Sequence, residues 1–210
     1  RLQENHGGVR GGVETTGHPD GWETRPEDDT GTIWYAFAPS ALSSYRYASG
    51  AAKLARALRD WDEGAARDFL DSAIRAFSWA EANRSEDMGE TYWDAQAAAE
   101  LLKTTGSAEY DQAFIAHMPF RENDLVFSLP RYVSDSIIPA MLAYAGIERA
   151  SAEHRAAIET VLRDRSTYWI DSARGTGYRF VKHPFAPVTF GSYTTPVYAG
   201  YLFRLYALYG

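Results

Sequence analysis

The acidic residues are the side chains whose types and spacing first suggest chemistry. Asp28 and Asp29 are adjacent carboxylates in the stretch PEDDT. A second acidic group precedes a predicted helix: Glu86, Asp87, Glu90 and Asp94. Its carboxylate oxygens could ligate a hard cation such as calcium, but the group lacks the regular spacing of a calcium-binding loop. Because acids in loops are usually solvated and acids at a helix start are favoured by its dipole, we predict no metal site here.

The histidines, serines and glycines form no known catalytic or phosphate-binding motif. The five histidines never approach H-E-x-x-H spacing, and each is expected on the surface or in a loop: His6, His18, His117, His154 and His183. No G-x-S-x-G stretch occurs, and the glycines of GGVRGG lack the strand-to-helix setting of a phosphate loop. Zinc hydrolase, serine hydrolase and nucleotide-binding activities therefore find no support in the sequence.

Length, charge and hydropathy narrow the class of protein. The 210 residues, 45% of them hydrophobic, can bury the core of one domain. The net charge of −7 argues against a nucleic-acid partner, because phosphate binding needs a basic surface. No apolar run reaches about 18 residues and no signal peptide is visible, so no membrane partner is expected. The start at Arg1 indicates either a removed leader or a piece of a longer polypeptide.

Two regions of the chain differ in pattern. Residues 1–40 are rich in Gly, Pro, Thr and acids without helical or strand periodicity, which predicts a loop-rich segment. Residues 41–210 repeat apolar side chains at helical spacing, which predicts helical hairpins and an all-α fold. Seven helices are expected, at 43–61, 66–82, 92–104, 107–117, about 133–145, 151–173 and 195–209. The chain is thus predicted to be a single helical domain or a fragment of one.

The expected helices have apolar faces that should meet a neighbour. These are Tyr47, Ala51, Leu54, Ala55 and Leu58 in the first helix, Phe69, Ala73, Ala76, Phe77 and Ala80 in the second, and Ile158, Val161 and Leu162 in the sixth. The third helix contains a block of alanines that is interrupted only by Gln96: Ala95, Ala97, Ala98 and Ala99. Alanine favours helix and lets a neighbouring backbone approach, so this helix is predicted to pack tightly. Gly106 should end it in the left-handed conformation, and Ser107 should cap the next helix.

Several stretches, in the same order along nearly the whole chain, resemble glycoside hydrolase family 9, the inverting cellulases. They are GGV at 7–9, PEDDT at 26–30, IWYAFAPSALSSYRYASGAAKLARAL at 33–58, WDAQAAAELLKTTGSAEY at 93–110 and FGSY at 190–193. The resemblance implies an (α/α)6 toroid whose inner and outer helices alternate and whose loops at one end form a glucan cleft. The seven expected helices would be about half of such a toroid, which makes it a partial one.

The resemblance also suggests which residues bind substrate. The predicted set is Arg46, Tyr47, Tyr92, Trp93, Tyr178, Phe190 and Tyr193. Arg46 lies at a helix start that the family places beside the cleft; it could donate to sugar hydroxyls or form a buried structural ion pair. Aromatic side chains serve as sugar-stacking platforms as well as core, so Trp93 could serve in either role. At Phe190 and Tyr193 the sequence departs from the Trp and Asn that are usual in the family.

The resemblance places the catalytic groups outside these residues. An inverting glycosidase needs a general acid and a general base about 6.5–9.5 Å apart. In the family the base comes from an upstream Asp-Ala-Gly-Asp element and the acid is a downstream glutamate, and neither motif occurs in this chain. No catalytic residue is therefore predicted here, and the chain alone is expected to be inactive.

The expected partners and location follow from the same resemblance. We expect a β-1,4-glucan or a related polysaccharide or oligosaccharide as ligand, the remaining segments of the same enzyme as partners, and an extracellular location. No cofactor is expected, although the resemblance allows for calcium. A non-catalytic carbohydrate-binding or structural subunit derived from such an enzyme is the alternative.

Overall fold

The computed structural model describes residues 3–15, 34–84, 92–118 and 134–175, and these residues form six α-helices and one small sheet. The helices are α1 (Ala41–Leu58), α2 (Glu63–Ala82), α3 (Trp93–Thr105), α4 (Ala108–His117), α5 (Ser134–Ala145) and α6 (Ala152–Arg174). The all-α prediction and its first six helices are confirmed to within a few residues at each end. The seventh predicted helix, 195–209, lies outside the described residues.

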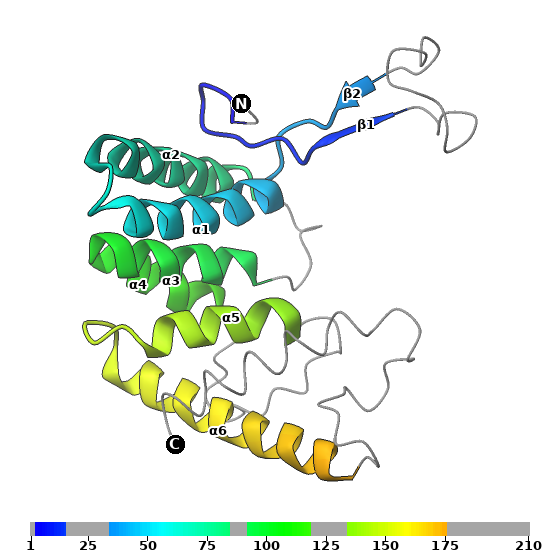
Figure 1. The fold of residues 1–210 in the computed structure, drawn as a ribbon, viewed down its shortest axis with the longest axis vertical. Helices are drawn as coiled ribbons and strands as arrows, with labels where there is room; N and C mark the ends of the chain where they lie inside the picture. Colours follow the sequence, from blue (N-terminus) through cyan, green and yellow to red (C-terminus); the bar gives the residue numbers. More distant parts are fainter. Residues whose placement is uncertain (1–2, 16–33, 85–91, 119–133, 176–210) are drawn as a thin grey trace.

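Consecutive helices form antiparallel hairpins (Figure 1). Helices α1, α3 and α5 lie side by side in one row, with α3 in contact with both of the others. Helix α2 packs on α1, α4 on α3 and α6 on α5. The row helices begin at one end of the molecule, and their partners return the chain to that end.

A short sheet precedes the helices. Strands β1 (Val13–Thr15) and β2 (Trp34–Ala36) pair antiparallel, with Val13 opposite Ala36. Both strands fall within the segment predicted to be loop-rich. Three residues are too few to show the alternation that identifies a strand in a sequence, which is why the pattern did not reveal them.

Helix α3 is the centre of the core. Nine consecutive residues, from Asp94 to Leu102, are buried, and Ala95, Ala97, Ala98 and Ala99 are 0% exposed. A helix buried on all sides needs small side chains where neighbouring backbones come close, and alanine meets this need without loss of helix propensity. The tight packing predicted for this helix is therefore confirmed.

Helix α1 buries only part of the face that the sequence predicts: Ala51 and Ala55 are 5% and 3% exposed, and Tyr47 packs partly buried against the core. Leu54 is 39% exposed and Leu58 is partly exposed, whereas Tyr45, Ala48 and Ala52 are fully buried. The prediction followed the bulky apolar residues, but α1 packs against α2 and α3 through small ones. The predicted faces of α2 and α6 are otherwise confirmed, with Phe69 of α2 only partly buried. The core includes Ala73, Ala76, Phe77 and Ala80 of α2 and Ile158, Val161 and Leu162 of α6.

The turn from α3 to α4 is built largely as expected. Gly106 has a φ of 73°, and its N–H donates to the Leu102 carbonyl at 2.8 Å. This is a left-handed helix end, which glycine adopts without steric cost. Ser107 stands at the cap position of α4, but its side chain makes no cap hydrogen bond. Its N–H instead donates to the Thr105 hydroxyl oxygen at 3.1 Å.

A buried carboxylate joins α3 to α1. Glu100 is 5% exposed and pairs with Arg56, and its Oε1 lies 3.5 Å from Lys53 Nζ. Arg56 also donates to the Glu100 carbonyl at 2.9 Å and to the Thr104 hydroxyl at 2.6 Å. A charge buried in a core is tolerated when it is paired and hydrogen-bonded, so this arrangement fixes the register of the two helices.

We predict that Ala98→Leu will lower the free energy of unfolding by about 1–3 kcal/mol, because added methylenes in a close-packed core force neighbours apart. Urea unfolding of the complete protein, followed by circular dichroism, measures this change. Ala57→Leu is the matched control, since Ala57 is an exposed helical alanine on α1. Equal stability of the two variants would contradict the close packing of α3.

Candidate functional site

The ends of the helical row differ in the length of their connections. At one end the turns 59–62, 106–107 and 146–151 are short. At the other end the row helices α1, α3 and α5 begin, and the chain enters α3 and α5 through the longer segments 83–92 and 118–133. Binding residues are usually carried by long connections on a rigid scaffold. The end where α1, α3 and α5 begin, hereafter the loop end, is therefore the candidate site.

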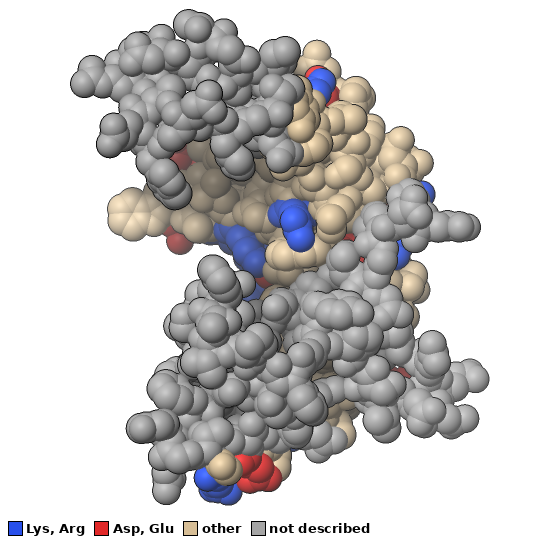
Figure 2. Space-filling model, turned by 90° about the vertical axis from the view of Figure 1, so that its right-hand side faces the viewer, with Lys and Arg blue, Asp and Glu red and all other residues tan. Residues whose placement is uncertain are grey.

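Figure 2 looks onto the loop end and shows Lys and Arg side chains on the described surface, between segments drawn in grey. Two of the predicted substrate-binding residues meet here. The guanidinium carbon of Arg46, on α1, lies 5.0 Å from the ring centroid of Trp93, the first residue of α3. A guanidinium at this distance is attracted to the face of the indole ring.

The environments of these two residues differ. Arg46 is exposed rather than buried, and with the carboxylates of the described residues its side chain forms no ion pair. Trp93 is partly buried and packs against the hydrophobic core. The core anchors the indole, the indole holds the guanidinium, and the guanidinium presents its donors at the surface.

Tyr92, another residue of the predicted substrate-binding set, is buried. Tyr92 is only 7% exposed and has a φ of 50°, a left-handed conformation that is uncommon for a residue other than glycine. Its carbonyl accepts the N–H of Gln96 at 3.0 Å, which places Tyr92 at the start of α3, and its burial leaves little of the ring at the surface.

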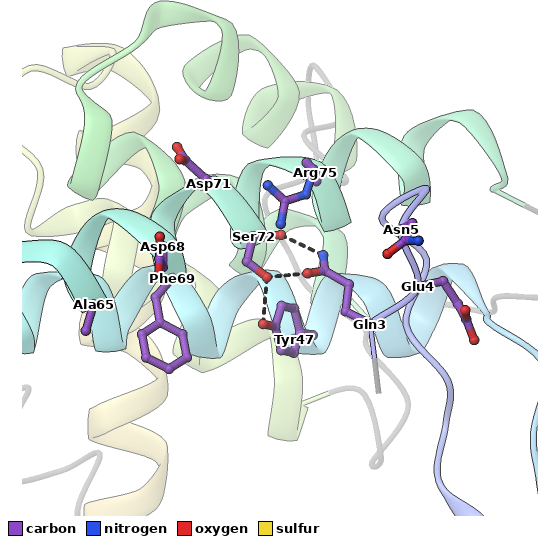
Figure 3. A pocket seen from close by; sticks show the side chains of 10 residues that line it. All are labelled: Gln3, Glu4, Asn5, Tyr47, Ala65, Asp68, Phe69, Asp71, Ser72 and Arg75. Carbon is purple, nitrogen blue, oxygen red and sulfur yellow. Dashed lines mark hydrogen bonds between the residues drawn. The ribbon is translucent and has the colours of Figure 1, made fainter. Parts of the chain in front are cut away.

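Tyr47 lines a separate groove between the N-terminal segment, α1 and α2 (Figure 3). Its hydroxyl lies 2.7 Å from the Ser72 hydroxyl, and Gln3 donates to the Ser72 carbonyl at 2.9 Å. Phe69 and Arg75 line the same groove. The structure therefore does not bring Tyr47 together with the Arg46–Trp93 pair.

Several predicted residues lie outside the described part of the chain: Tyr178, Phe190, Tyr193, Asp28, Asp29, Glu86, Asp87 and Glu90. Among the residues that are described, no group of three His, Asp or Glu side chains could hold a metal ion. No helix of the described ranges is long and apolar enough to cross a membrane.

A polar network at the loop end was not anticipated. It links Tyr45 of α1, Glu81 at the end of α2, Arg84 just beyond it, Asp94 of α3 and His117 of α4. The side chains of Asp94 and His117 are only 5% and 9% exposed, so the predictions of a solvated Asp94 and a surface His117 are wrong. No local pattern could have revealed the network, because its members are far apart in the sequence and meet only when four helices pack.

The network shifts the pKa of two of its members. Burial, followed by the hydrogen bond to Glu81 at 2.6 Å, raises the pKa of the Tyr45 hydroxyl far above its usual range. For Glu81, burial would raise the pKa, but the hydrogen bonds from His117 and Tyr45, together with nearby positive charge, hold the pKa below its usual value. Glu81 is thus a carboxylate that the folded state stabilises in its charged form.

Comparison with known proteins gives no matching family model and no matching curated protein. Solved structures do match. GH family 9 endoglucanase J30 has a TM-score of 0.81 and 26% identity, over 99% of this chain and 40% of that chain. A metagenome-derived glycoside hydrolase family 9 endoglucanase has a TM-score of 0.77 and 19% identity, with the same 99% and 40% coverage. AaCel9A in complex with cellobiose-like isofagomine has a TM-score of 0.71 and 18% identity, over 87% and 36%.

These matches confirm the all-α toroid-like class that the helical hairpins define. The resemblance to glycoside hydrolase family 9 predicted from the sequence is likewise confirmed, on the fold and on the 26% identity with J30. The chain spans about 40% of the length of that enzyme.

We predict that acid will destabilise the protein partly through Glu81. Because its folded pKa is lowered, its contribution is present above the unfolded value near 4.5 and is lost as the pH falls through the folded pKa. Melting temperatures between pH 7 and pH 3 should therefore fall less steeply below about 4.5 in Glu81→Gln than in the wild type.

Glu63→Gln is the control for this titration, because Glu63 forms an exposed pair with Arg67. Exposed pairs of this kind contribute only about 0–1 kcal/mol. Parallel acid profiles for the wild type and Glu81→Gln would show that Glu81 is not stabilised in its charged form.

Proposed function

We propose that this chain is part of an inverting glycoside hydrolase that acts on β-1,4-glucan or a related polysaccharide, and that its loop end contributes to the glucan-binding cleft. The observation that supports this most is the match to the family 9 endoglucanase J30 over 99% of the chain. AaCel9A, which has the same fold, was solved with a cellobiose-like isofagomine. A polymeric substrate of this kind also favours an extracellular enzyme.

In this proposal Arg46 is the principal sugar contact of the described residues. Its guanidinium offers several N–H donors in a fixed plane, and sugar hydroxyl oxygens can accept them. The indole of Trp93 holds the guanidinium at 5.0 Å and limits its rotamers, which reduces the entropy lost on binding. Trp93 itself contributes an apolar edge beside the sugar rather than a free stacking face.

The two carboxyl groups of an inverting reaction are assigned to the other segments of the enzyme. One must protonate the leaving oxygen while the other activates a water on the opposite side of the ring. The part of this chain is to bind and orient the glucan so that the scissile bond lies between them. A non-catalytic carbohydrate-binding subunit would use the same contacts without turnover.

We predict that Arg46→Ala will weaken binding of cellohexaose to the complete protein by roughly 10- to 100-fold, because hydrogen bonds from a charged group contribute about 1.5–3 kcal/mol. Trp93→Ala should also weaken binding, since it releases the guanidinium. Isothermal titration calorimetry measures both. Arg59→Ala, at the opposite end of α1, is the matched control and should bind as the wild type does. Unchanged affinity in Arg46→Ala would argue against a sugar contact here.

We also predict that the 210-residue chain, purified alone, will release no reducing ends from barley β-glucan or carboxymethyl cellulose. General acid and base groups each supply factors of about 10² to 10⁴, and binding alone does not replace them. Turnover that disappears in Asp28→Asn or Asp29→Asn would overturn this prediction and assign catalysis to the PEDDT stretch.

A further inference from the structure

His117 occupies the centre of the polar network at the loop end. Its Nε2 lies 2.8 Å from Glu81 Oε1, and its Nδ1 is hydrogen-bonded to Arg84 and lies 3.6 Å from Asp94 Oδ2. The edge of the Tyr45 ring also meets the imidazole, with 6.2 Å between the ring centroids. The His117 side chain at the end of α4 therefore lies next to Tyr45 of α1, Asp94 of α3, and Glu81 and Arg84 at and just beyond the end of α2.

The partners of the two ring nitrogens define the tautomer of His117. Nε2 faces a carboxylate, which can only accept, so Nε2 must carry the proton. Nδ1 faces a guanidinium, which can only donate, so Nδ1 must be the acceptor. Arg84 in turn reaches Asp94 Oδ2 at 2.7 Å. A neutral imidazole therefore matches the acceptor that faces Nε2 and the donor that faces Nδ1.

The network fixes the backbone next to both members of the Arg46–Trp93 pair. Asp94 follows Trp93 directly, and its Oδ1 accepts the Ala95 N–H at 2.7 Å in the first turn of α3. Tyr45 precedes Arg46 directly, and its hydroxyl donates to Glu81. A displacement of His117 would therefore be transmitted to the start of α1 and to the start of α3 together.

We propose that His117 is a positioning residue for glucan binding: its neutral Nε2–H tautomer joins α4 to the starts of α1 and α3 and so sets Arg46 over Trp93. Only the statement that the Arg46–Trp93 pair binds glucan rests on the proposed function. The placement of the pair by His117 is a separate physical claim that can be tested without ligand.

Protonation of His117 should disturb this arrangement. The groups that face the ring are Glu81 and Arg84 from the end of α2, Asp94 from α3 and Tyr45 from α1. A proton on Nδ1 would oppose the Arg84 N–H and would seek Asp94 Oδ2, which Arg84 now occupies.

The test uses the complete protein labelled with 5-fluorotryptophan, with the ¹⁹F resonance of Trp93 assigned by Trp93→Phe. His117→Gln places an amide N–H where Nε2 lies and should keep the wild-type resonance, whereas His117→Ala should shift it. His154→Ala is the matched control, because that histidine contacts Ser151 at the start of α6.

Binding of cellohexaose provides the second measurement. We expect His117→Ala to weaken it about 3- to 10-fold, a loss of roughly 0.6–1.4 kcal/mol, and His117→Gln to restore it. A Trp93 resonance that is the same in His117→Ala and in the wild type would overturn the positioning role. A wild-type protein that does not bind cellohexaose would contradict the proposed function, and the resonance comparison would still decide the role of His117.

Discussion

The burial of α3 is the constraint on which the rest of the structure depends. A helix with nine consecutive buried residues must be approached from several sides, and α1, α4 and α5 all contact it. Close approach is feasible because Ala95 and Ala97–Ala99 have no side chain beyond Cβ. Helices α1 and α5, on either side of α3, run in the same direction as α3. All three therefore begin at the same end of the molecule (Figure 1).

Buried charges give this apolar row a defined register. Towards the C-terminal ends of the two helices, Glu100 of α3 pairs with Arg56 and Lys53 of α1. At the loop end Asp94 pairs with Arg84, and both are connected to His117. Burying charges costs free energy unless each has a partner, so a shift of α3 by one residue would leave several groups unpaired. The same contacts that hold the core also place Trp93 beside Arg46.

The features that could be predicted from the sequence are those that depend on short stretches of the chain. Helical periodicity gave α1 to α6, the alanine block gave the buried helix, and Gly106 gave the turn after it. The inward face of α1 was predicted only in part. Ala51 and Ala55 are buried as expected, but Leu54 is exposed, because α1 packs against its neighbours through small side chains. The network around His117 was missed since it depends on four helices meeting, and no single segment carries that information.

The central claim is that glucan binds at the loop end, where α1, α3 and α5 begin. Hydrogen exchange of the complete protein with and without cellohexaose tests this claim most directly. The account predicts that exchange will slow on binding at the starts of α1 and α3, in residues 41–47 and 92–97. The turns 59–62 and 106–107 at the other end should be unchanged. Slowing confined to those turns, or no slowing at either helix start at saturating ligand, would contradict the account.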